Sequence, residues 1–308
     1  MSGTETIGAP VSDPAFPGKT LKRELQPRRA GSRRSNLLLA ISVMLYVFLY
    51  APIAIVVAQS FNRAPRGTEW LGFTTGWYGA LAQNEPAQHA TVITLTLAAM
   101  STAVSTTLGT LLALALRRGT FFGKRFAEAT LQGVIVVPDI VMAIALLMFY
   151  AVLRRWTDAL APGLFTMTLA HITFQIPFVT LVVRSRLAGL DPALTEAAHD
   201  LGASRGQCFR HVTLPLIGPG ILAGALLAFT LSLDDFVVSF FTSGAGATTL
   251  PIFIYSSVKR GLTPDINALS TLLVLASVAG AVVVMLLQKS NSKSPIPNPK
   301  QAPNSKLQ

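Results

Sequence analysis

Three carboxylates stand out because they fall inside apolar stretches of the chain. They are Asp139, Asp234 and Asp235, and the rest of the 14 acidic residues lie in polar segments. A charge within a bilayer is costly, so such residues normally meet an opposite charge or face a water-filled path. No lysine or arginine falls inside the same apolar stretches. The pattern therefore favours a path for a cationic solute, whose own charge would meet these carboxylates in passing.

Each carboxylate also has a purely structural interpretation. Asp234 and Asp235 would then form a polar helix end bonded to backbone or loop groups. Asp139 would bond a serine, a threonine or His171 on a neighbouring helix. Adjacent helical residues point about 100° apart, so Asp234 and Asp235 cannot both face the path equally. The sequence leaves open which of the two does.

His171 and Gln175 lie about one helical turn apart and share a face. They would line the path or, as is commoner, hydrogen-bond between helices. The four histidines show no spacing typical of metal ligands, and no nucleophile stands with a base. The single cysteine, Cys208, excludes an internal disulfide. We therefore expect no enzyme activity, no metal and no cofactor bound by this chain.

Long apolar runs must position these residues. The chain has 308 residues, of which 51% are hydrophobic and only 13% charged, whereas soluble domains carry about a quarter charged residues. A hydrocarbon core of roughly 30 Å is crossed by about 20 helical residues. The sequence thus predicts an all-α integral membrane protein, with Asp139 beside a kink at Pro138. Six transmembrane helices are expected, at Leu37–Ala58, Thr91–Leu116, Gly133–Leu153, Gly163–Val183, Leu216–Phe241 and Asn267–Leu287.

The positive charges predict how these helices are oriented. Of the 25 lysines and arginines, 19 lie on the side of both termini and of residues 190–215, and such an excess marks the cytoplasmic side. We interpret residues 1–35 and 289–308 as disordered cytoplasmic tails and 36–58 as the first transmembrane helix, with the five later helices within 90–288. The net charge of +11 then reflects lysines and arginines that orient the helices and face anionic membrane lipid. No nucleic-acid partner is therefore expected.

The segment from Leu190 to Pro215 is polar and turn-rich, between two long apolar runs. Asp191-Pro192 supplies a helix N-cap and a first helical residue that needs no N–H. Gly202 stands where a helix end adopts a left-handed backbone. Ser204 can cap a second short helix, which Pro215 would close. The segment is therefore predicted to form two small helices meeting at a glycine, at the membrane surface.

Within this segment, Glu196-Ala197-Ala198 is followed by three residues, Gly202, nine residues and Val212-Thr213-Leu214-Pro215. This pattern resembles the EAA signature of permease subunits of bacterial ABC importers, with valine in place of isoleucine. The resemblance implies a type I ABC-importer permease fold, in which this loop is the coupling helix that docks in a cleft of a cytoplasmic ATPase. Glu196 would pair with a basic group of that ATPase. The ATPase-coupling residues it implies are Glu196, Ala197, Ala198, Asp200, Gly202, Leu214 and Pro215.

Further segments resemble one branch of that family, the second permease subunit of spermidine/putrescine importers. They include residues 138–143, 171–174, 229–235 and 264–269. A polyamine is a cation, which agrees with the path predicted above. The substrate-path residues are then expected among Asp139, Asp234, Asp235, His171 and Gln175.

The resemblance also implies partners and a location. The partners are a homologous second permease, two ATPase subunits that bind ATP and Mg, and a periplasmic solute-binding protein, all at the bacterial inner membrane. Two alternatives stay open. One is an ABC permease for another small solute, such as an aminophosphonate or an iron complex. The other is a secondary cation transporter or channel with the three aspartates as proton or cation sites.

Overall fold

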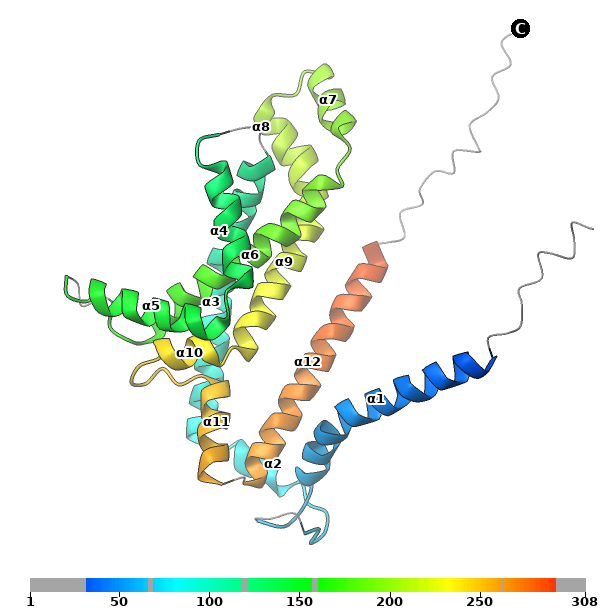
Figure 1. The fold of residues 1–308 in the computed structure, drawn as a ribbon, viewed down its shortest axis with the longest axis vertical. Helices are drawn as coiled ribbons and strands as arrows, with labels where there is room; N and C mark the ends of the chain where they lie inside the picture. The colour runs from blue at the N-terminus through cyan, green and yellow to red at the C-terminus, as the bar shows by residue number, and fades with distance from the viewer. Residues whose placement is uncertain (1–31, 66–68, 118–120, 157–159, 262, 292–308) are drawn as a thin grey trace, which may run out of the picture. The chain divides into compact units, whose positions relative to one another are not determined.

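The computed structural model describes residues 32–65, 69–117, 121–156, 160–261 and 263–291 (Figure 1). Within these ranges every regular element is a helix, apart from one isolated bridge between Asn62 and Phe73. The chain divides into a unit of residues 1–55 and a unit of residues 56–308. The second unit holds every residue of the predicted solute path and of the segment 190–215. Residues 1–31 and 292–308, which belong to the two predicted tails, lie outside the described residues.

The helices follow one another along the chain with short connections. Their bounds are α1 (Ser32–Gln59), α2 (Gly76–Leu81), α3 (Glu85–Arg117), α4 (Lys124–Val136), α5 (Asp139–Leu153), α6 (Leu164–Ala188), α7 (Pro192–Asp200), α8 (Arg205–Cys208), the π-helical turn η2 (Phe209–Thr213), α9 (Leu214–Asp234), α10 (Val237–Thr242), α11 (Leu250–Arg260) and α12 (Pro264–Asn291).

Four stretches are long and apolar enough to cross a membrane: part of α1, α3, α6 and the continuous stretch Arg205–Asp234. The bent pair α4 and α5 makes a fifth if it counts as one span, and α12 contains a shorter apolar run, Pro264–Gly280. The predicted all-α class is confirmed. The predicted fourth span is a helix that runs on past Val183 to Ala188. Its added turn brings the Arg184 guanidinium within 2.9 Å of the Glu128 carboxylate on α4.

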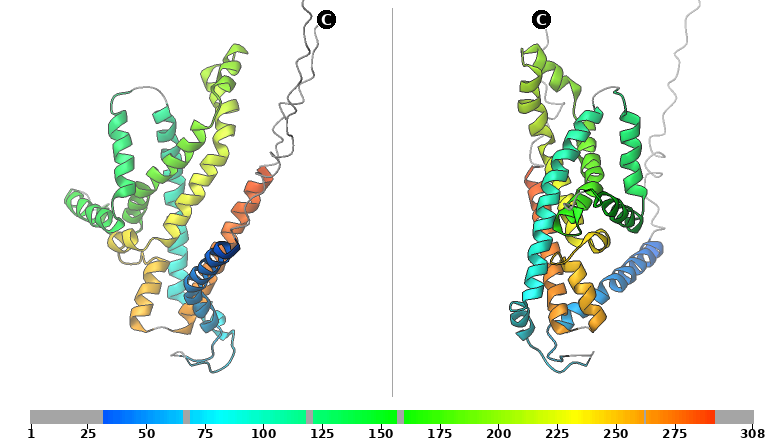
Figure 2. Two further views of the ribbon diagram at one scale, coloured as in Figure 1. Left: turned by 45° about the vertical axis from the view of Figure 1, so that its right-hand side comes forward. Right: turned by 90° about the vertical axis from the view of Figure 1, so that its left-hand side faces the viewer.

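Helices α3, α6 and α9 form the core of the second unit (Figure 2). They approach closely at Val179 of α6, because both facing positions are glycines. A β-carbon at Gly109 of α3 would lie 2.8 Å from the Val179 side chain, and one at Gly224 of α9 would lie 3.2 Å from it. The Thr180 hydroxyl donates to the Gly109 carbonyl at 3.2 Å. Small residues that admit close backbone contact are typical of helix packing in membranes.

The predicted third span, Gly133–Leu153, is wrong as one continuous helix. α4 ends at Val136, α5 begins at Asp139, and the two helices are bent by 115°. Proline has no N–H to continue a helix and forces the preceding residue into an extended backbone. Val137 accordingly has a ψ of 128°. Pro138 therefore breaks the helix instead of kinking it, and Asp139 is the first residue of α5 rather than a residue inside one continuous helix.

The predicted fifth span, Leu216–Phe241, is also wrong as one helix. α9 ends at Asp234, Asp235 has an extended backbone with a ψ of 120°, and α10 begins at Val237. The Asp235 carboxylate accepts hydrogen bonds from the Val238 and Ser239 amides, at 3.3 and 2.7 Å. A side chain that caps the next helix competes with the continuous backbone ladder. Asp235 therefore starts a new helix instead of continuing α9.

Candidate functional site

Helix α7 has the ends that the sequence predicts. The Asp191 carboxylate accepts from the Ala193 amide at 2.9 Å, with Pro192 as the first helical residue. At the other end Gly202 has a φ of +81°. Its amide donates to the His199 carbonyl at 2.9 Å, and the Ala203 amide donates to the Ala198 carbonyl at 3.0 Å. These two bonds form a Schellman motif, which fixes the turn out of α7.

The second short helix begins as predicted and ends differently. The Ser204 hydroxyl accepts from the Gln207 amide, and the Gln207 side chain accepts from the Ser204 amide, so the two residues form a capping box. The prediction that Pro215 closes this helix is wrong. α8 passes through the π-helical turn η2 into α9 without a break. A proline ring clashes with the carbonyl four residues earlier, and the wider π-helical turn just before Pro215 relieves that crowding.

The residues predicted to couple to an ATPase lie on this projection, at one end of the unit (Figures 1 and 2). Glu196, Ala197, Asp200 and Gly202 are exposed, and Ala198 is half-buried. Leu201, at the tip of α7, is 90% exposed. Leu214 and Pro215 lie at the start of α9 and are also exposed. The loop thus presents acidic and apolar side chains on a backbone fixed by two caps.

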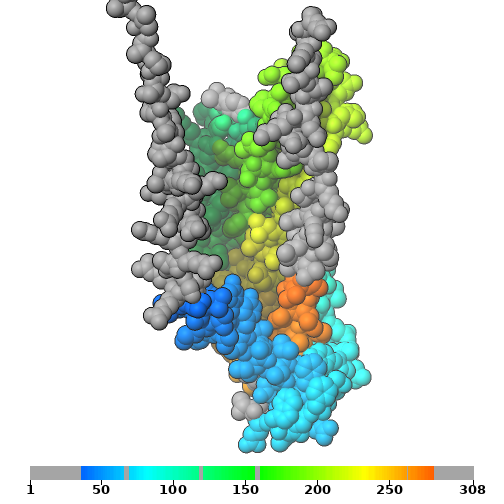
Figure 3. Space-filling view, turned by 90° about the vertical axis from the view of Figure 1, so that its right-hand side faces the viewer, coloured from blue at the N-terminus to red at the C-terminus, as the bar shows by residue number. Residues whose placement is uncertain are grey.

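A regular seam joins this loop to the break between α9 and α10. On α9 the seam residues recur every fourth position, and each meets a residue of α6. A β-carbon at Gly220 would lie 2.8 Å from Arg186, and one at Gly224 would meet Val179. The Arg186 Nε also donates to the Leu216 carbonyl at 3.2 Å. Figure 3 shows the green surface of α6 meeting the yellow surface of α9 along this face.

Further along, the same seam becomes polar. The Gln175 amide nitrogen donates to the Ala228 carbonyl at 3.2 Å and to the Ser101 hydroxyl of α3 at 3.1 Å. The Ser105 hydroxyl donates to the Gln175 side-chain oxygen at 2.8 Å. The Ser101 and Ser232 hydroxyls lie 3.4 Å apart. All four of these side chains are buried.

His171 ends the polar seam and is fully buried. Its Nδ1 lies 2.8 Å from the Ser232 hydroxyl, and its Nε2 lies 3.0 Å from the Ser239 hydroxyl and 3.3 Å from the Asp235 carboxylate. A carboxylate only accepts hydrogen bonds, so Nε2 carries the proton when it bonds Asp235. In the neutral imidazole Nδ1 then accepts from Ser232. One ring therefore joins α6, the end of α9 and the start of α10.

The three carboxylates predicted to lie in membrane spans have different surroundings. Asp235 is 11% exposed and held by His171 and two backbone amides. Asp234, the last residue of α9, and Asp139, the first residue of α5, are both exposed in the single chain. The structure thus brings Asp235 and His171 together with Gln175 in one network. It does not bring Asp139 into that network.

The sequence prediction missed four residues of the network: Ser101, Ser105, Ser232 and Ser239. The sequence carries one signal for them, which is their spacing. Two of the serines are four residues apart on α3, and the other two are seven residues apart around the α9–α10 break. Serine hydroxyls in apolar helices commonly hydrogen-bond their own helix instead. Spacing alone therefore does not distinguish a network member from a serine that bonds its own backbone.

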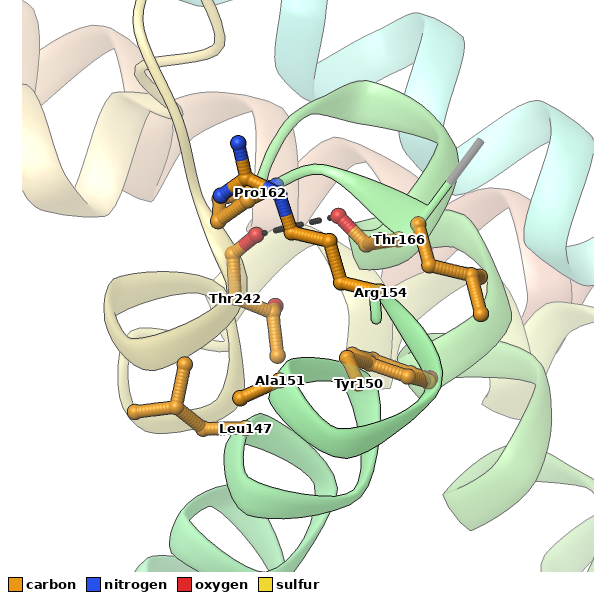
Figure 4. Close-up of a pocket in the computed structure, with 8 residues that line it drawn as sticks. Leu147, Tyr150, Ala151, Arg154, Pro162, Thr166 and Thr242 are labelled. Atoms are coloured by element: carbon orange, nitrogen blue, oxygen red, sulfur yellow. Dashed lines mark hydrogen bonds between the residues drawn. The ribbon is translucent and has the colours of Figure 1, made fainter. Parts of the chain in front are cut away.

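A pocket of about 220 Å³ lies apart from this network, between α5, the start of α6 and the end of α10. Figure 4 shows the Arg154 side chain reaching over it beside Pro162 and Thr242. The Thr166 hydroxyl donates to the Thr242 carbonyl at 3.3 Å. The remaining lining is largely apolar, with Leu147, Tyr150, Ala151 and Leu160. No carboxylate is among the described residues that line this pocket, so it offers no negative charge for a cationic solute.

The arrangement of α3, α6 and α9 under a projecting α7–α8 loop is that of ABC-transporter permeases. A bacterial ABC transporter involved in the import of the acidic polysaccharide alginate has a chain that superposes with a TM-score of 0.63, at 13% identity, covering 86% of this chain and 98% of that one. An amino acid ABC transporter gives a TM-score of 0.55 at 18% identity, covering 71% and 100%. At these identities the likeness concerns the fold alone.

The sequence then gives the family. Residues 105–294 match the family described as binding-protein-dependent transport system inner membrane component, and this chain belongs to it. It is 42% identical over 249 residues to the spermidine/putrescine transport system permease protein PotC of Escherichia coli K12, covering 81% of this chain and 92% of that protein. It is 40% identical over 263 residues to the putrescine transport system permease protein PotI of the same strain, covering 84% and 94%.

Proposed function

We propose that this chain is a membrane-spanning permease subunit of an ATP-driven importer of polyamines. The observation that carries the proposal is the identity of 40–42% with permeases named for spermidine and putrescine, over more than nine-tenths of their length. The intramembrane carboxylates suit such a cargo, because a polyamine brings the positive charge that the apolar stretches of this chain lack.

In this proposal the chain crosses the bacterial inner membrane six times. The spans are α1, α3, the bent pair α4 and α5, α6, α9 with its preceding turn, and α12. Both termini and the α7–α8 loop face the cytoplasm, supported by the excess of lysine and arginine on that side. The break after Asp234 then lies toward the periplasm.

The solute path is proposed to run past Asp234 and Asp139. Both carboxylates are exposed in the single chain, and an exposed carboxylate facing lipid would be strongly unfavourable. Asp235 is engaged by His171 and by the cap of α10. It therefore holds the break in place and leaves Asp234 free to face the solute. His171 and Gln175, buried in this conformation, would position the break rather than contact the solute.

The seam suggests how a movement of the ATPase subunits is transmitted to the solute path. The α7–α8 loop docks on an ATPase subunit, with Glu196 facing a basic group. Because glycines and hydrogen bonds hold α6 and α9 together along the seam, a push on the loop moves both helices as one body. The ends of α6 and α9 away from the loop carry the hydrogen-bond network around His171 and Gln175, and Asp234. Closure of two ATPase subunits on ATP would thus open the path to the periplasm, and hydrolysis would reset it.

The proposed assembly needs partners to complete it. They are a second, homologous permease, two ATPase subunits that bind ATP and Mg, and a periplasmic solute-binding protein. One related structure fits this plan, since it is an alginate ABC transporter in complex with a periplasmic protein that holds an alginate pentasaccharide. In this assembly the present chain carries the solute and performs no covalent chemistry.

The test is uptake of labelled spermidine and putrescine by the complete complex in proteoliposomes, with ATP inside. We expect ATP-dependent uptake by the wild type and at least a ten-fold loss on Asp234→Asn. Glu128→Gln is the matched control, because that carboxylate pairs with Arg184 near the C-terminal end of α6, away from the break after Asp234. Uptake of neither amine by a complex that still hydrolyses ATP would refute the polyamine assignment. Equal uptake by Asp234→Asn and the wild type would remove Asp234 from the path.

A further inference from the structure

Three aromatic rings gather beside the break between α9 and α10. Phe236 and Phe240 lie around the start of α10, and their rings contact that of Tyr255 on α11; Figure 1 shows the helices α10 and α11. The ring centroids of Phe236 and Tyr255 are 4.7 Å apart, and those of Phe240 and Tyr255 are 6.3 Å apart. Phe240 remains 47% exposed and Tyr255 40% exposed. The cluster therefore offers open ring surface instead of a closed core.

An ammonium group already occupies one of these faces. The Lys259 Nζ lies over the Tyr255 ring, 4.8 Å from its centroid. This distance is within the range of a cation–π contact. The neighbouring Arg260 turns to the Ser257 hydroxyl of its own helix, at 3.3 Å. The Tyr255 face thus accommodates a primary ammonium, and a primary ammonium is the end group of a polyamine.

The surroundings of the cluster suit an amine more than a lipid chain. Asp234 is exposed and stands two residues before Phe236. Two residues of backbone span at most about 7 Å, so the backbone of Asp234 lies close to that of Phe236. A carboxylate at this depth is too costly to turn toward hydrocarbon. The exposed Asp234 carboxylate therefore faces water or another protein chain.

We propose that Phe236, Phe240 and Tyr255 form an ammonium-binding site at the outer end of the path, with Lys259 as its resident ligand. The inference rests on the proposed function and adds a site to it. A polyamine arriving from the periplasm displaces the Lys259 ammonium from Tyr255 and lays its methylene chain on the phenylalanine rings. Because Lys259 is exposed and held by one weak contact, the exchange needs no rearrangement of the helices. The next carboxylate along the path is Asp234.

The experiment measures binding of labelled spermidine to the purified complex of permease and ATPase chains, without the binding protein, by equilibrium dialysis in an uncharged detergent. Lys259→Met removes the resident competitor, and Lys259→Arg keeps a cation in its place. Tyr255→Leu removes the ring, and Tyr255→Phe keeps it. An exposed cation–π contact corresponds to about a two- to five-fold change in affinity.

We expect Lys259→Met to lower the dissociation constant two- to five-fold and Lys259→Arg to leave it near the wild-type value. Tyr255→Leu should raise it by a similar factor, and Tyr255→Phe should not. Unchanged or weaker binding by Lys259→Met, or equal binding by the two Tyr255 variants, overturns the site. If a Tyr255 variant fails to assemble, the comparison of the dissociation constants of Lys259→Met and Lys259→Arg tests the site. ATP-dependent uptake by the wild-type complex without this pattern leaves the proposed function standing and removes only the aromatic site.

Discussion

Replacing His171 with leucine should loosen the break between α9 and α10. The imidazole is fully buried and lies next to Ser232, Ser239 and Asp235, at 2.8, 3.0 and 3.3 Å. Leucine fills a similar volume and offers no polar atom. The two hydroxyls and the carboxylate are each deprived of a partner, while Asp235 keeps its two backbone amides. The substitution thus removes the polar link and leaves most of the packing.

The size of the effect follows from what remains bonded. A buried polar group left without a partner costs about 1–3 kcal/mol. Interhelical hydrogen bonds in membranes are worth less, about 0.6 kcal/mol on average and up to roughly 1.7. Because the imidazole no longer bonds its three partners and Asp235 is partly compensated, we expect a free-energy loss of about 2 kcal/mol. For a chain of 308 residues, with an unfolding entropy of about 2.1 cal/mol/K per residue, that lowers the unfolding midpoint by about 3 °C.

Thermal unfolding of the detergent-solubilised complex, at one fixed scan rate, measures this loss. His171→Gln keeps a donor and an acceptor and should lose less than half as much. In the His171→Leu background, Ser232→Ala should cost about 1 kcal/mol less than it does alone, because its partner is already gone. A midpoint unchanged by His171→Leu, or equal losses for the leucine and glutamine variants, would refute the structural role of the network.

Three further predictions concern the seam and the loop. Gly109→Ala should destabilise the complex by about 1–3 kcal/mol, because its β-carbon would lie 2.8 Å from the Val179 side chain. Gly218→Ala, with nothing within 4 Å, should not lower the unfolding midpoint. Gly202→Ala places a side chain at a φ of +81°, which costs about 1 kcal/mol, and should reduce the ATPase recovered on co-purification. A full yield of ATPase would count against the loop's role. Glu196→Ala changes an exposed residue and should leave stability within about 0.5 kcal/mol, while uptake falls and ATP hydrolysis continues; normal uptake would contradict the coupling role.

The α7–α8 loop is predictable in detail because its structure is local. Asp191, Gly202 and Ser204 each act through backbone groups a few residues away, and such caps are determined by residue type and spacing. The wrong prediction at Pro215 has a related reason. Proline usually ends a helix, and a π-helical turn that accommodates it has no strong sequence signature.

The broken spans are not predictable from hydropathy. The apolar runs through Pro138 and Asp235 are long enough to cross a membrane. Hydropathy depends on side-chain polarity alone, so it does not indicate where the backbone bends. Pro138 carries a signal for a kink, and its actual bend of 115° depends on where α5 packs. The break at Asp235 depends on a bond to His171, which lies 64 positions earlier. Contacts between distant segments decide both cases.

The sequence predicts the candidate site as a set of residue types and not as an arrangement. Asp234 and Asp235 are expected to differ because adjacent helical residues diverge. The structure gives a different reason, since Asp235 has left the helix to cap α10. His171 and Gln175 are correctly placed on one face of α6. Their partners on α3 and α9 follow only from the packing of three helices.

Transport of polyamines by this chain, at the expense of ATP hydrolysed by its partners, can be measured directly. The quantity is the amount of spermidine taken up per ATP hydrolysed, by the complete complex with its binding protein in proteoliposomes. We expect uptake that requires ATP, persists when a protonophore abolishes any proton gradient, and separates from hydrolysis in Glu196→Ala. Spermidine uptake that proceeds without ATP and stops with the protonophore would show instead a secondary transporter.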